Sequence, residues 1–347
     1  MNIGNKQIGP GNPCFIIAEA GVNHNGDINL AKQLIDIASE SGADAVKFQT
    51  FTAESLVTKD VSKAEYQKET TGSEDSNQFQ MLKKLELGKN DHLLLKKYAE
   101  EKGLMFLSTP FDSKSSDFLE SLGIDAYKIP SGEVTNLPFL KHVAKKGKPM
   151  ILSTGMSTLE EVTRAVKTMT DAGNRNIILL HCVTSYPTPD SEANIKAMLE
   201  LQKTGVEIVG YSDHTMGIYA PLAAVALGAK VIEKHFTLDR NMEGPDHQAS
   251  LEPGELKEMV TGIRTIEKML GSGIKTPSPC EKGNISIIRK RIVAARDISA
   301  GELLSKENLA LKRSSAGLEP SEFENLFGKK TKQDIKKDEP ITEGVFQ

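Results

Sequence analysis

Apolar positions along residues 15–270 follow two alternating patterns. Short runs rich in β-branched residues predict strands, and longer segments with apolar residues every three or four positions, such as Leu30, Leu34 and Ile37, predict helices. The predicted strands are, in chain order, Phe15–Ala18, Ala45–Gln49, Leu104–Ser108, Ala126–Ile129, Met150–Ser153, Ile177–His181, Glu207–Tyr211 and Lys230–His235.

Strands that alternate with helices are typical of βα units and a parallel sheet. Eight such units make a closed (β/α)8 barrel, and the glycine-rich phosphate turn of an open doubly wound sheet is missing from the sequence. We therefore predict an α/β fold with a TIM barrel over residues 1–275. Glycines that favour left-handed helix ends follow the helical segments at Gly42, Gly103, Gly123, Gly147, Gly173, Gly205 and Gly228.

The connection from Thr50 to Asn90 is much longer than the few residues usual between a strand and a helix. It includes the polar stretch Lys68–Asn77. We expect a lid or a binding loop, which places this segment at the active face of the barrel.

The pattern changes after Leu270, where Gly, Ser and Pro become frequent. We predict a linker at 276–288 and a second domain at 289–347, with strands Ile292–Ala295 and Leu309–Lys312. A core this small is marginal alone, so we expect this domain to dock against the barrel or a second subunit.

The charge balance excludes some partners. The chain has 43 Lys and Arg against 47 Asp and Glu, a net charge of −4, with no long block of one sign. Nucleic acid and anionic membrane surfaces are therefore disfavoured. Residues 1–14 lack the apolar region of a signal peptide, and the apolar stretch Ile218–Ile232 is too short to span a bilayer. We expect a cytoplasmic protein.

Three cysteines, Cys14, Cys182 and Cys280, are far apart and show no CxxC spacing. An odd number at such spacing predicts neither a disulfide framework nor a thiolate zinc site. We expect reduced thiols.

The predicted strands are unusually polar where they end. In a barrel these ends meet at the rim that carries the catalytic groups. Any one such residue could be a hydrogen-bonded core group or a helix cap, but their shared position favours an active site. The rim residues are Glu19, Lys47, Gln49, Thr109, Lys128, Ser131, Glu133, Ser153, His181, Ser212, Asp213, His214, Glu233 and His235.

Lys47 and Lys128 are single basic residues within apolar strands. An unpaired buried ammonium is costly, so we expect an anionic ligand to compensate them. With the hydroxyls of Ser131, Ser153 and Ser212 they would form a pocket for a small phosphorylated carboxylate. A Schiff-base lysine, as in barrel aldolases, is the rival interpretation.

His214 and His235 end consecutive strands, so their imidazoles can approach each other. Two protein ligands leave positions for water and substrate oxygens, which suits Mn²⁺ or a similar ion as a Lewis acid. A hydrogen-bonded histidine pair is the alternative.

With these motifs assembled, the chain resembles the sialic acid synthase family, the phosphoenolpyruvate-dependent nonulosonic acid synthases. The tail, with Ala294–Ile298 and Lys312-Arg313, looks like the antifreeze-like (SAF, β-clip) domain of that family. The barrel motifs that carry the resemblance are Ile17–Gly26, Val46–Phe51, Ser108–Asp112, Lys128–Glu133, Ser153–Met156, Tyr186–Pro189, Tyr211–His214, Ile232–Asp239 and Gly244–His247.

The resemblance implies condensation of phosphoenolpyruvate with N-acetylmannosamine to N-acetylneuraminate and phosphate, with cleavage of the C–O bond. By motif, His214 and His235 would hold a divalent metal, Mn²⁺ by preference, with Mg²⁺ or Co²⁺ as alternatives. The metal would polarise the sugar aldehyde, and Glu19 would orient or deprotonate the attacking water.

The resemblance also assigns the substrate contacts. In that family the antifreeze-like domain looks exchanged between the two subunits of a homodimer. The resemblance therefore implies that the arginine at the place of Arg313 reaches the partner's sugar site. Here Ser314–Gly317 replaces the Pro-Gly-x-Gly that is frequent in the family. Cys182–Ser185, beside the expected N-acyl pocket, lacks the asparagine found near there in some sialic acid enzymes. Phosphoenolpyruvate would be bound by Lys47, Thr109, Lys128, Ser131, Ser153 and Ser212, and the sugar by Gln49, Phe111, Glu133, Thr184, Tyr186, Asp246 and Arg313.

Three alternatives stay open. Within the family, Ala20–Asn23 and Gly210–Thr215 look at least as similar to the legionaminate branch, which uses 2,4-diacetamido-2,4,6-trideoxymannose. A Schiff-base aldolase or lyase would use pyruvate and resist chelators. A carbohydrate-binding protein would show no turnover.

Overall fold

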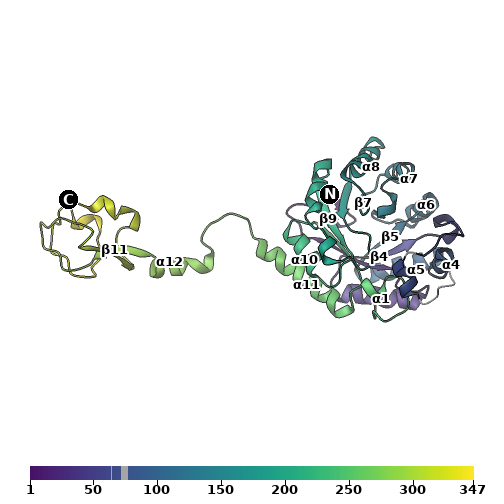
Figure 1. Ribbon diagram of the computed structural model, residues 1–347, viewed down its shortest axis with the longest axis horizontal. Coiled ribbons are helices and arrows are strands. Elements are labelled where there is room, and N and C mark those ends of the chain that lie inside the picture. Colours follow the sequence, from purple (N-terminus) through teal and green to yellow (C-terminus); the bar gives the residue numbers. More distant parts are fainter. Residues whose placement is uncertain (64, 72–76) are drawn as a thin grey trace. The chain divides into compact units, whose positions relative to one another are not determined.

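Eight parallel strands form one curved sheet in the first part of the chain (Figure 1). Their order is β5-β4-β3-β10-β9-β8-β7-β6, and the two terminal strands of this order, β5 and β6, contact each other. The sheet is therefore a near-closed barrel, which confirms the predicted fold. The strands are β3 (Phe15–Gly21), β4 (Ala45–Thr50), β5 (Met105–Pro110), β6 (Tyr127–Ile129), β7 (Met150–Ser153), β8 (Ile177–His181), β9 (Ile208–Asp213) and β10 (Val231–His235).

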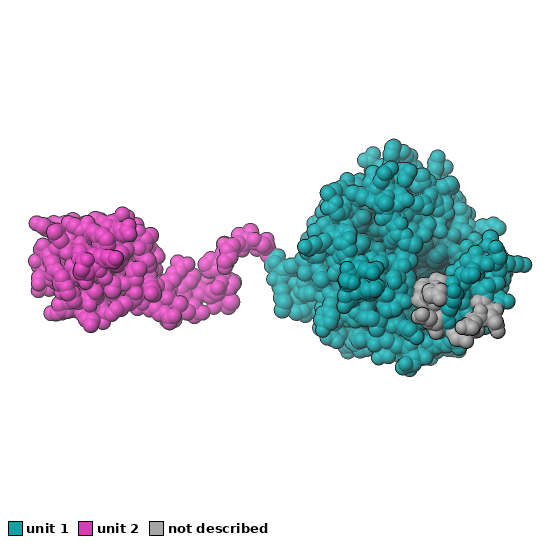
Figure 2. Space-filling view, viewed as in Figure 1, with its two compact units in different colours: residues 1–271 teal, residues 272–347 magenta. Residues whose placement is uncertain are grey.

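The structure, a computed structural model, describes residues 1–63, 65–71 and 77–347. All eight predicted strands are present, and β9 runs two residues further than predicted, to Asp213. The chain divides into two compact units, Met1–Gly271 and Ser272–Gln347, coloured separately in Figure 2. No described helix is long and apolar enough to cross a membrane.

Helices surround the sheet (Figure 1). The seven glycines expected at helix ends all have positive φ, and Gly123, at φ 74°, ends α6 in the left-handed region that glycine adopts without strain. The main helices are α1 (Ile28–Glu40), α5 (Lys89–Glu101), α6 (Ser113–Leu122), α7 (Leu137–Ala144), α8 (Leu159–Asp171), α9 (Ala197–Glu200), α10 (Tyr219–Ala226) and α11 (Pro253–Leu270).

Short elements complete the first unit. The long connection after β4 contains three helices, α2 (Ala53–Leu56), α3 (Glu65–Thr70) and α4 (Gln78–Lys84), rather than a continuous loop. Part of the predicted polar stretch, residues 72–76, lies outside the described residues. The remaining elements are the hairpin β1 (Asn2–Ile3) and β2 (Lys6–Gln7), with η1 (Ser131–Glu133), η2 (Asp190–Glu192), η3 (Leu201–Thr204) and η4 (His247–Ala249).

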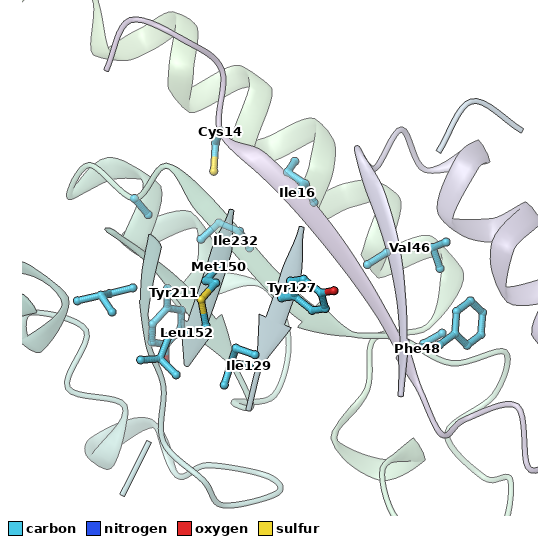
Figure 3. Packing of buried hydrophobic residues seen from close by; sticks show 14 of the residues in the cluster. Cys14, Ile16, Val46, Phe48, Tyr127, Ile129, Met150, Leu152, Tyr211 and Ile232 are labelled. Atoms are coloured by element: carbon cyan, nitrogen blue, oxygen red, sulfur yellow. The ribbon is translucent and has the colours of Figure 1, made fainter. Parts of the chain in front are cut away.

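Side-chain alternation along the strands separates two apolar layers and positions the site. Ile16 faces the helices and packs with residues such as Val46 and Ile232 (Figure 3). Phe15 and Ile17 face the barrel interior and belong to a second cluster. Glu19 continues the inward series at the carboxyl end of β3, so the interior changes from apolar to charged along one strand.

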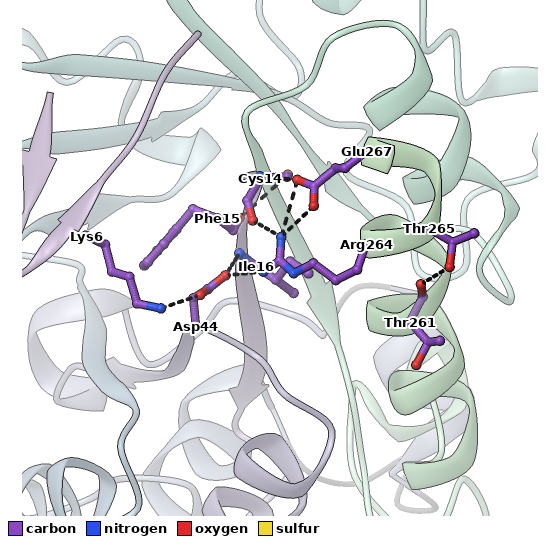
Figure 4. Close-up of polar contacts among 9 residues, drawn as sticks. All are labelled: Lys6, Cys14, Phe15, Ile16, Asp44, Thr261, Arg264, Thr265 and Glu267. Carbon is purple, nitrogen blue, oxygen red and sulfur yellow. Dashed lines mark hydrogen bonds and ion pairs between the residues drawn. The ribbon is translucent and has the colours of Figure 1, made fainter. Parts of the chain in front are cut away.

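A polar cluster joins α11 to the amino ends of the first strands (Figure 4). Arg264 donates to the Cys14 carbonyl at 2.7 Å and to Asp44 Oδ2 at 2.8 Å. Asp44 also accepts from the Ile16 backbone N–H at 2.9 Å. These contacts hold the last helix of the barrel against its first strand, at the end opposite Glu19.

The second unit has its own small core of Ile, Leu and Ala side chains. Its antiparallel strands β11 (Lys290–Ala294) and β12 (Leu309–Arg313) lie where strands were predicted. Residues 276–288, the predicted linker, contain η5 (Pro279–Glu281) and α12 (Lys282–Ile288). The remaining turns are η6 (Pro320–Glu322), η7 (Glu324–Leu326) and η8 (Glu343–Val345).

Candidate active site

A cavity of about 370 Å³ lies at the carboxyl ends of the strands. Residues from the α2–α4 connection also line it, as expected for a segment at the active face. Tertiary structure thus brings together nearly all of the predicted site. The residues with a predicted role in catalysis, metal binding or substrate binding that line the cavity are Glu19, Lys47, Gln49, Thr109, Phe111, Lys128, Ser131, Ser153, Thr184, Tyr186, Ser212, His214, His235 and Asp246.

Two predicted residues do not line this cavity. Glu133, in η1, accepts a hydrogen bond from the Asn136 amide at 2.6 Å. Arg313 is the last residue of β12 in the second unit, and its side chain is exposed. Their proposed contacts with the sugar remain predictions.

Two rim residues face away from the cavity. His181 lies 3.1 Å from the Ala193 carbonyl through Nε2, and Asp213 forms an ion pair with Lys234 behind the strands. The expectation that they join the rim was wrong, because side chains alternate along a strand and both follow an inward-facing neighbour.

Lys47 is held by groups from two neighbouring strands. Its Nζ lies 2.9 Å from Glu19 Oε2 on β3 and donates to Thr109 Oγ1 on β5 at 2.8 Å. All three side chains are buried. The ammonium group of Lys47 is therefore held in place at the cavity where the strand ends meet.

Glu233, on β10, is the centre of the charged cluster. Its Oε1 lies 3.2 Å from Lys128 Nζ and accepts from Ser212 at 2.9 Å, and its Oε2 lies 3.6 Å from Lys47 Nζ. The premise that the lysines are unpaired was wrong, since each contacts a carboxylate. Glu233 was predicted at the rim, and it does line the cavity, but it was assigned no role in binding or catalysis. It precedes His235 by two positions and so shares its face of the strand.

Burial and charge decide which groups are ionised. Burial raises the pKa of Glu19 to about 7, although Lys47 opposes this. Burial also acts to raise the pKa of Glu233, but Lys128 and Lys47 outweigh it and bring that pKa to about 2. Burial lowers the pKa of Lys128. Glu233 is thus a permanent anion, whereas Glu19 can exchange a proton near neutral pH.

His214 and His235 face each other across the cavity with ring centroids 5.5 Å apart. The Tyr186 ring lies 4.0 Å from the His214 ring, centroid to centroid. His214 Nδ1 lies 2.6 Å from the Val183 carbonyl, an acceptor, so this nitrogen carries the proton and Nε2 keeps its lone pair. Burial lowers the pKa of His214 to about 4 and that of His235 well below its usual value. Both rings are neutral and able to bind a cation.

The donor set fits a catalytic divalent metal. His235 Nδ1 is buried and has no hydrogen-bond partner among the described residues, and the nearest Asp246 oxygen is 3.9 Å away. Within the same part of the chain, no group of three or more His, Cys, Asp or Glu is placed to hold a metal. Two imidazoles would leave open positions for water and substrate, as a catalytic ion needs and a structural one does not.

Hydroxyl groups line the side of the cavity formed by β6 and β7. Ser131 Oγ accepts from the Gly155 backbone N–H at 2.9 Å and lies 3.1 Å from Cys182 Sγ. A Cβ at Gly155 would lie only 2.3 Å from Thr184 Oγ1, so glycine is required for this close packing. Ser153 Oγ is buried without a partner in the described chain, which leaves a donor free for a ligand oxygen.

Another wall of the cavity comes from the long connection and is largely apolar, with Gln67 and Gln78 as its polar members. Met81 and Leu85 form a small cluster with Val22 and Phe51, separate from the barrel cores. Leu56 and Leu82 pack against this cluster and also line the cavity. The cavity therefore combines a charged floor with a largely apolar wall.

The sequence matches the NeuB family over residues 34–275 and the SAF domain over residues 289–344. The first match covers well over half of the chain. The chain belongs to the NeuB family. The resemblance to sialic acid synthases with an antifreeze-like domain is thereby confirmed, as is the class of enzyme, a phosphoenolpyruvate-dependent transferase.

Similar members of the NeuB family differ in the acid that they make. The chain is 53% identical to an N,N'-diacetyllegionaminic acid synthase of Campylobacter jejuni, over 95% of this chain and 99% of that protein. It is 50% identical to the enzyme of the same name from Legionella pneumophila, over 96% and 94%.

A solved structure of the family supports the fold. The N-acetylneuraminic acid synthetase of Leptospira borgpetersenii, crystallised with citrate, is 39% identical, with a TM-score of 0.74 over 82% of this chain and 94% of that one. For the sugar substrate, the higher identities favour the legionaminate alternative over the N-acetylmannosamine hypothesis.

Proposed function

We propose that the protein is an N,N'-diacetyllegionaminic acid synthase, which condenses phosphoenolpyruvate with 2,4-diacetamido-2,4,6-trideoxymannose and releases phosphate. The observation that carries this proposal is identity of 53% and 50% to two enzymes of that name, against 39% to the N-acetylneuraminic acid synthetase. All three comparisons extend over most of the chain.

The apolar wall of the cavity supports a deoxy sugar. Leu56, Met81 and Leu82 offer contacts that favour a methyl group, such as C6 of the trideoxy sugar, over a hydroxymethyl group. A hydroxyl facing this wall would lose its water without gaining a hydrogen bond from these three side chains.

Phosphoenolpyruvate would occupy the charged floor. Lys47 and Lys128 supply positive charge for its phosphate and carboxylate, and the unpartnered Ser153 hydroxyl supplies a donor. Glu233 acts to raise the pKa of both lysines, which favours the ammonium forms that the two anionic groups of the substrate would meet.

Bond changes follow from this placement. C3 of phosphoenolpyruvate bonds to the aldehyde carbon of the open sugar, whose oxygen takes up a proton. A water oxygen bonds to C2, and Glu19, with its pKa of about 7, accepts the proton that this water loses. The bond between C2 and the phosphate oxygen then breaks, phosphate leaves with the electron pair, and the C2 hydroxyl passes its remaining proton to the departing phosphate, which yields the 2-keto acid.

His214 and His235 would hold the divalent metal, for which we propose Mn²⁺, with Mg²⁺ or Co²⁺ as alternatives. When bound, the metal supplies Lewis-acid polarisation of the sugar aldehyde. The Val183 carbonyl fixes the His214 ring in the tautomer that presents Nε2 to the cavity. Tyr186, stacked close to His214, limits rotation of that ring.

A Schiff-base lysine receives little support. Burial acts to lower the pKa of Lys47, but Glu19 and Glu233 outweigh it and raise that pKa, which stabilises the ammonium rather than the amine nucleophile. Lys128, whose pKa burial lowers, is the lysine to test. Borohydride with pyruvate should leave both lysines unmodified, and a reduced adduct at Lys128 would favour the aldolase.

The test of function is phosphate release from phosphoenolpyruvate with Mn²⁺, with each of the two sugars. We expect kcat/KM to favour the trideoxy sugar over N-acetylmannosamine by about 100-fold or more, because a misplaced hydroxyl or missing acetamido group leaves site groups unmatched. Preference for N-acetylmannosamine would make the protein an N-acetylneuraminate synthase. No turnover of either, with tight sugar binding, would favour the carbohydrate-binding alternative.

A further inference from the structure

A fully buried ion pair lies directly behind the cavity. Lys234 Nζ is 2.5 Å from Asp213 Oδ2, and neither side chain has any exposed surface. The two residues are register partners on β10 and β9, one step along from the partners Glu233 and Ser212. Since side chains alternate, Glu233 and Ser212 point into the cavity and the ion pair points outward, toward the helix layer.

The hydrogen bonds of this pair converge on the segment that carries His214. Asp213 accepts from both the backbone N–H and the hydroxyl of Thr215, each at 3.0 Å. Lys234 also donates to the Thr215 carbonyl. The residues on both sides of His214 are thus tied to β10, the strand that ends in His235.

A second set of contacts holds His214 from the other side. Its carbonyl accepts from the Thr188 backbone N–H at 2.8 Å, and its ring Nδ1–H donates to the Val183 carbonyl. The backbone of this residue therefore has few ways to move while the ion pair is intact.

Stability alone does not account for this pair. A buried ion pair can often be replaced by apolar residues with little loss of stability, because removing two charges from water offsets their attraction. Tyr211 and Phe236, close to the pair in sequence, are buried members of the main apolar core. The pair is accounted for better by its directional hydrogen bonds, which apolar residues cannot make.

We propose that Asp213 and Lys234 are positioning residues, which fix residues 213–215 so that the His214 imidazole faces that of His235 at the spacing needed to hold a divalent cation. The metal part of this inference rests on the proposed function, but the ring geometry does not. Neither residue touches substrate.

The decisive variant is the double substitution Asp213→Leu/Lys234→Met in the full chain. It removes both charges together, so no unpaired buried charge remains. We expect Mn²⁺ affinity, measured by calorimetric titration, to fall by about 10-fold or more, as for other residues that orient metal ligands. kcat should fall with it, while KM for phosphoenolpyruvate stays within about 3-fold.

Two further variants separate positioning from general destabilisation. Asp213→Asn/Lys234→Gln is neutral but keeps hydrogen-bonding groups, so it should recover most of the Mn²⁺ affinity. Asp44→Leu/Arg264→Met removes an ion pair at the amino end of the barrel, which should lower Tm without altering Mn²⁺ affinity. Equal loss of Mn²⁺ affinity in this control would overturn the inference, as would wild-type affinity in Asp213→Leu/Lys234→Met.

Nitrogen-15 NMR of the histidine rings in metal-free protein gives a readout that does not depend on the proposed function. In wild type the His214 Nδ1–H, bound to the Val183 carbonyl, should give a protected signal. Its loss in Asp213→Leu/Lys234→Met supports the inference even if the wild type binds no Mn²⁺, which would count only against the metal site. An unchanged signal overturns the inference.

Discussion

The carboxylate of Glu233 lies 3.2 Å from the ammonium nitrogen of Lys128, and both side chains are almost wholly buried. A third charge, on Lys47, is 3.6 Å from the other oxygen of this carboxylate. One anion thus separates two cations that come from different strands. Glu233 compensates Lys128 and shares the compensation of Lys47 with Glu19, which makes it central to both stability and binding.

Glu233→Gln should therefore destabilise the protein. Removing one partner of a buried ion pair leaves an uncompensated charge and costs about 3–5 kcal/mol. Urea unfolding followed by circular dichroism measures the change. Glu54→Gln, which breaks an exposed pair with Lys83, should leave the urea midpoint unchanged. A Glu233→Gln variant as stable as wild type would contradict the pairing.

Glu19 should set the acid limb of the rate profile. With a pKa of about 7, it is ionised above neutral pH and able to take a proton from water, so kcat/KM should rise with pH through about 7. Glu19→Gln should lower kcat by about 10²–10⁴-fold and abolish this limb. Phosphate release that persists unchanged in the variant would remove Glu19 from the water-activation step.

The same shift predicts how stability depends on pH. The pKa of Glu19 is about 7 when folded and near its ordinary value of 4.5 when unfolded, so between these pH values the folded protein binds more protons. Its contribution to unfolding free energy must fall as pH rises across that window. Glu19→Gln should flatten this fall in urea titrations between about pH 4.5 and 7, and a slope identical to wild type would refute the shift.

Glu233 should affect the pH dependence of the unfolding free energy with the opposite sign to Glu19. Its pKa of about 2 lies below the unfolded value, so its stabilisation is present above about 4.5 and lost as pH falls toward 2. Glu233→Gln should remove part of the acid-induced loss of stability in that lower range.

Metal removal should stop the reaction without unfolding the protein. The His214–His235 pair lies at a cavity rim and not in an apolar core, so a chelator should abolish phosphate release while Tm changes by only a few degrees. Mn²⁺ should restore activity. His235→Asn should lower Mn²⁺ affinity, and His142→Asn, at an exposed histidine on α7, should not. Full activity after exhaustive chelation would exclude the metal.

Mixing two inactive variants tests the proposed domain-swapped homodimer. If Arg313 acts in the partner's site, a heterodimer of Glu19→Gln and Arg313→Ala subunits has one site with both native residues. Random reassociation should then restore about a quarter of wild-type activity, since half of the dimers are mixed and each has one intact site. If Arg313 acts within its own subunit, the mixture stays inactive.

The sequence by itself determined the barrel fold and which residues form the site. Periodicity places all eight strands, because a buried parallel strand must be apolar and short while its covering helix repeats every 3.6 residues. Polar residues at strand ends must then meet at one rim, whatever the detailed packing, and 14 of the predicted residues do line one cavity.

Tertiary structure alone decided how these residues pair. Glu19 meets Lys47, and Glu233 meets Lys128, across strands whose relative register depends on closure of the whole barrel. The direction of Asp213, away from the rim and toward Lys234, depends on where β9 ends, and the strand runs further than its apolar run predicts. Charges far apart in sequence become neighbours only through packing, so the sequence indicates which residues form the site and the fold determines their protonation and their partners.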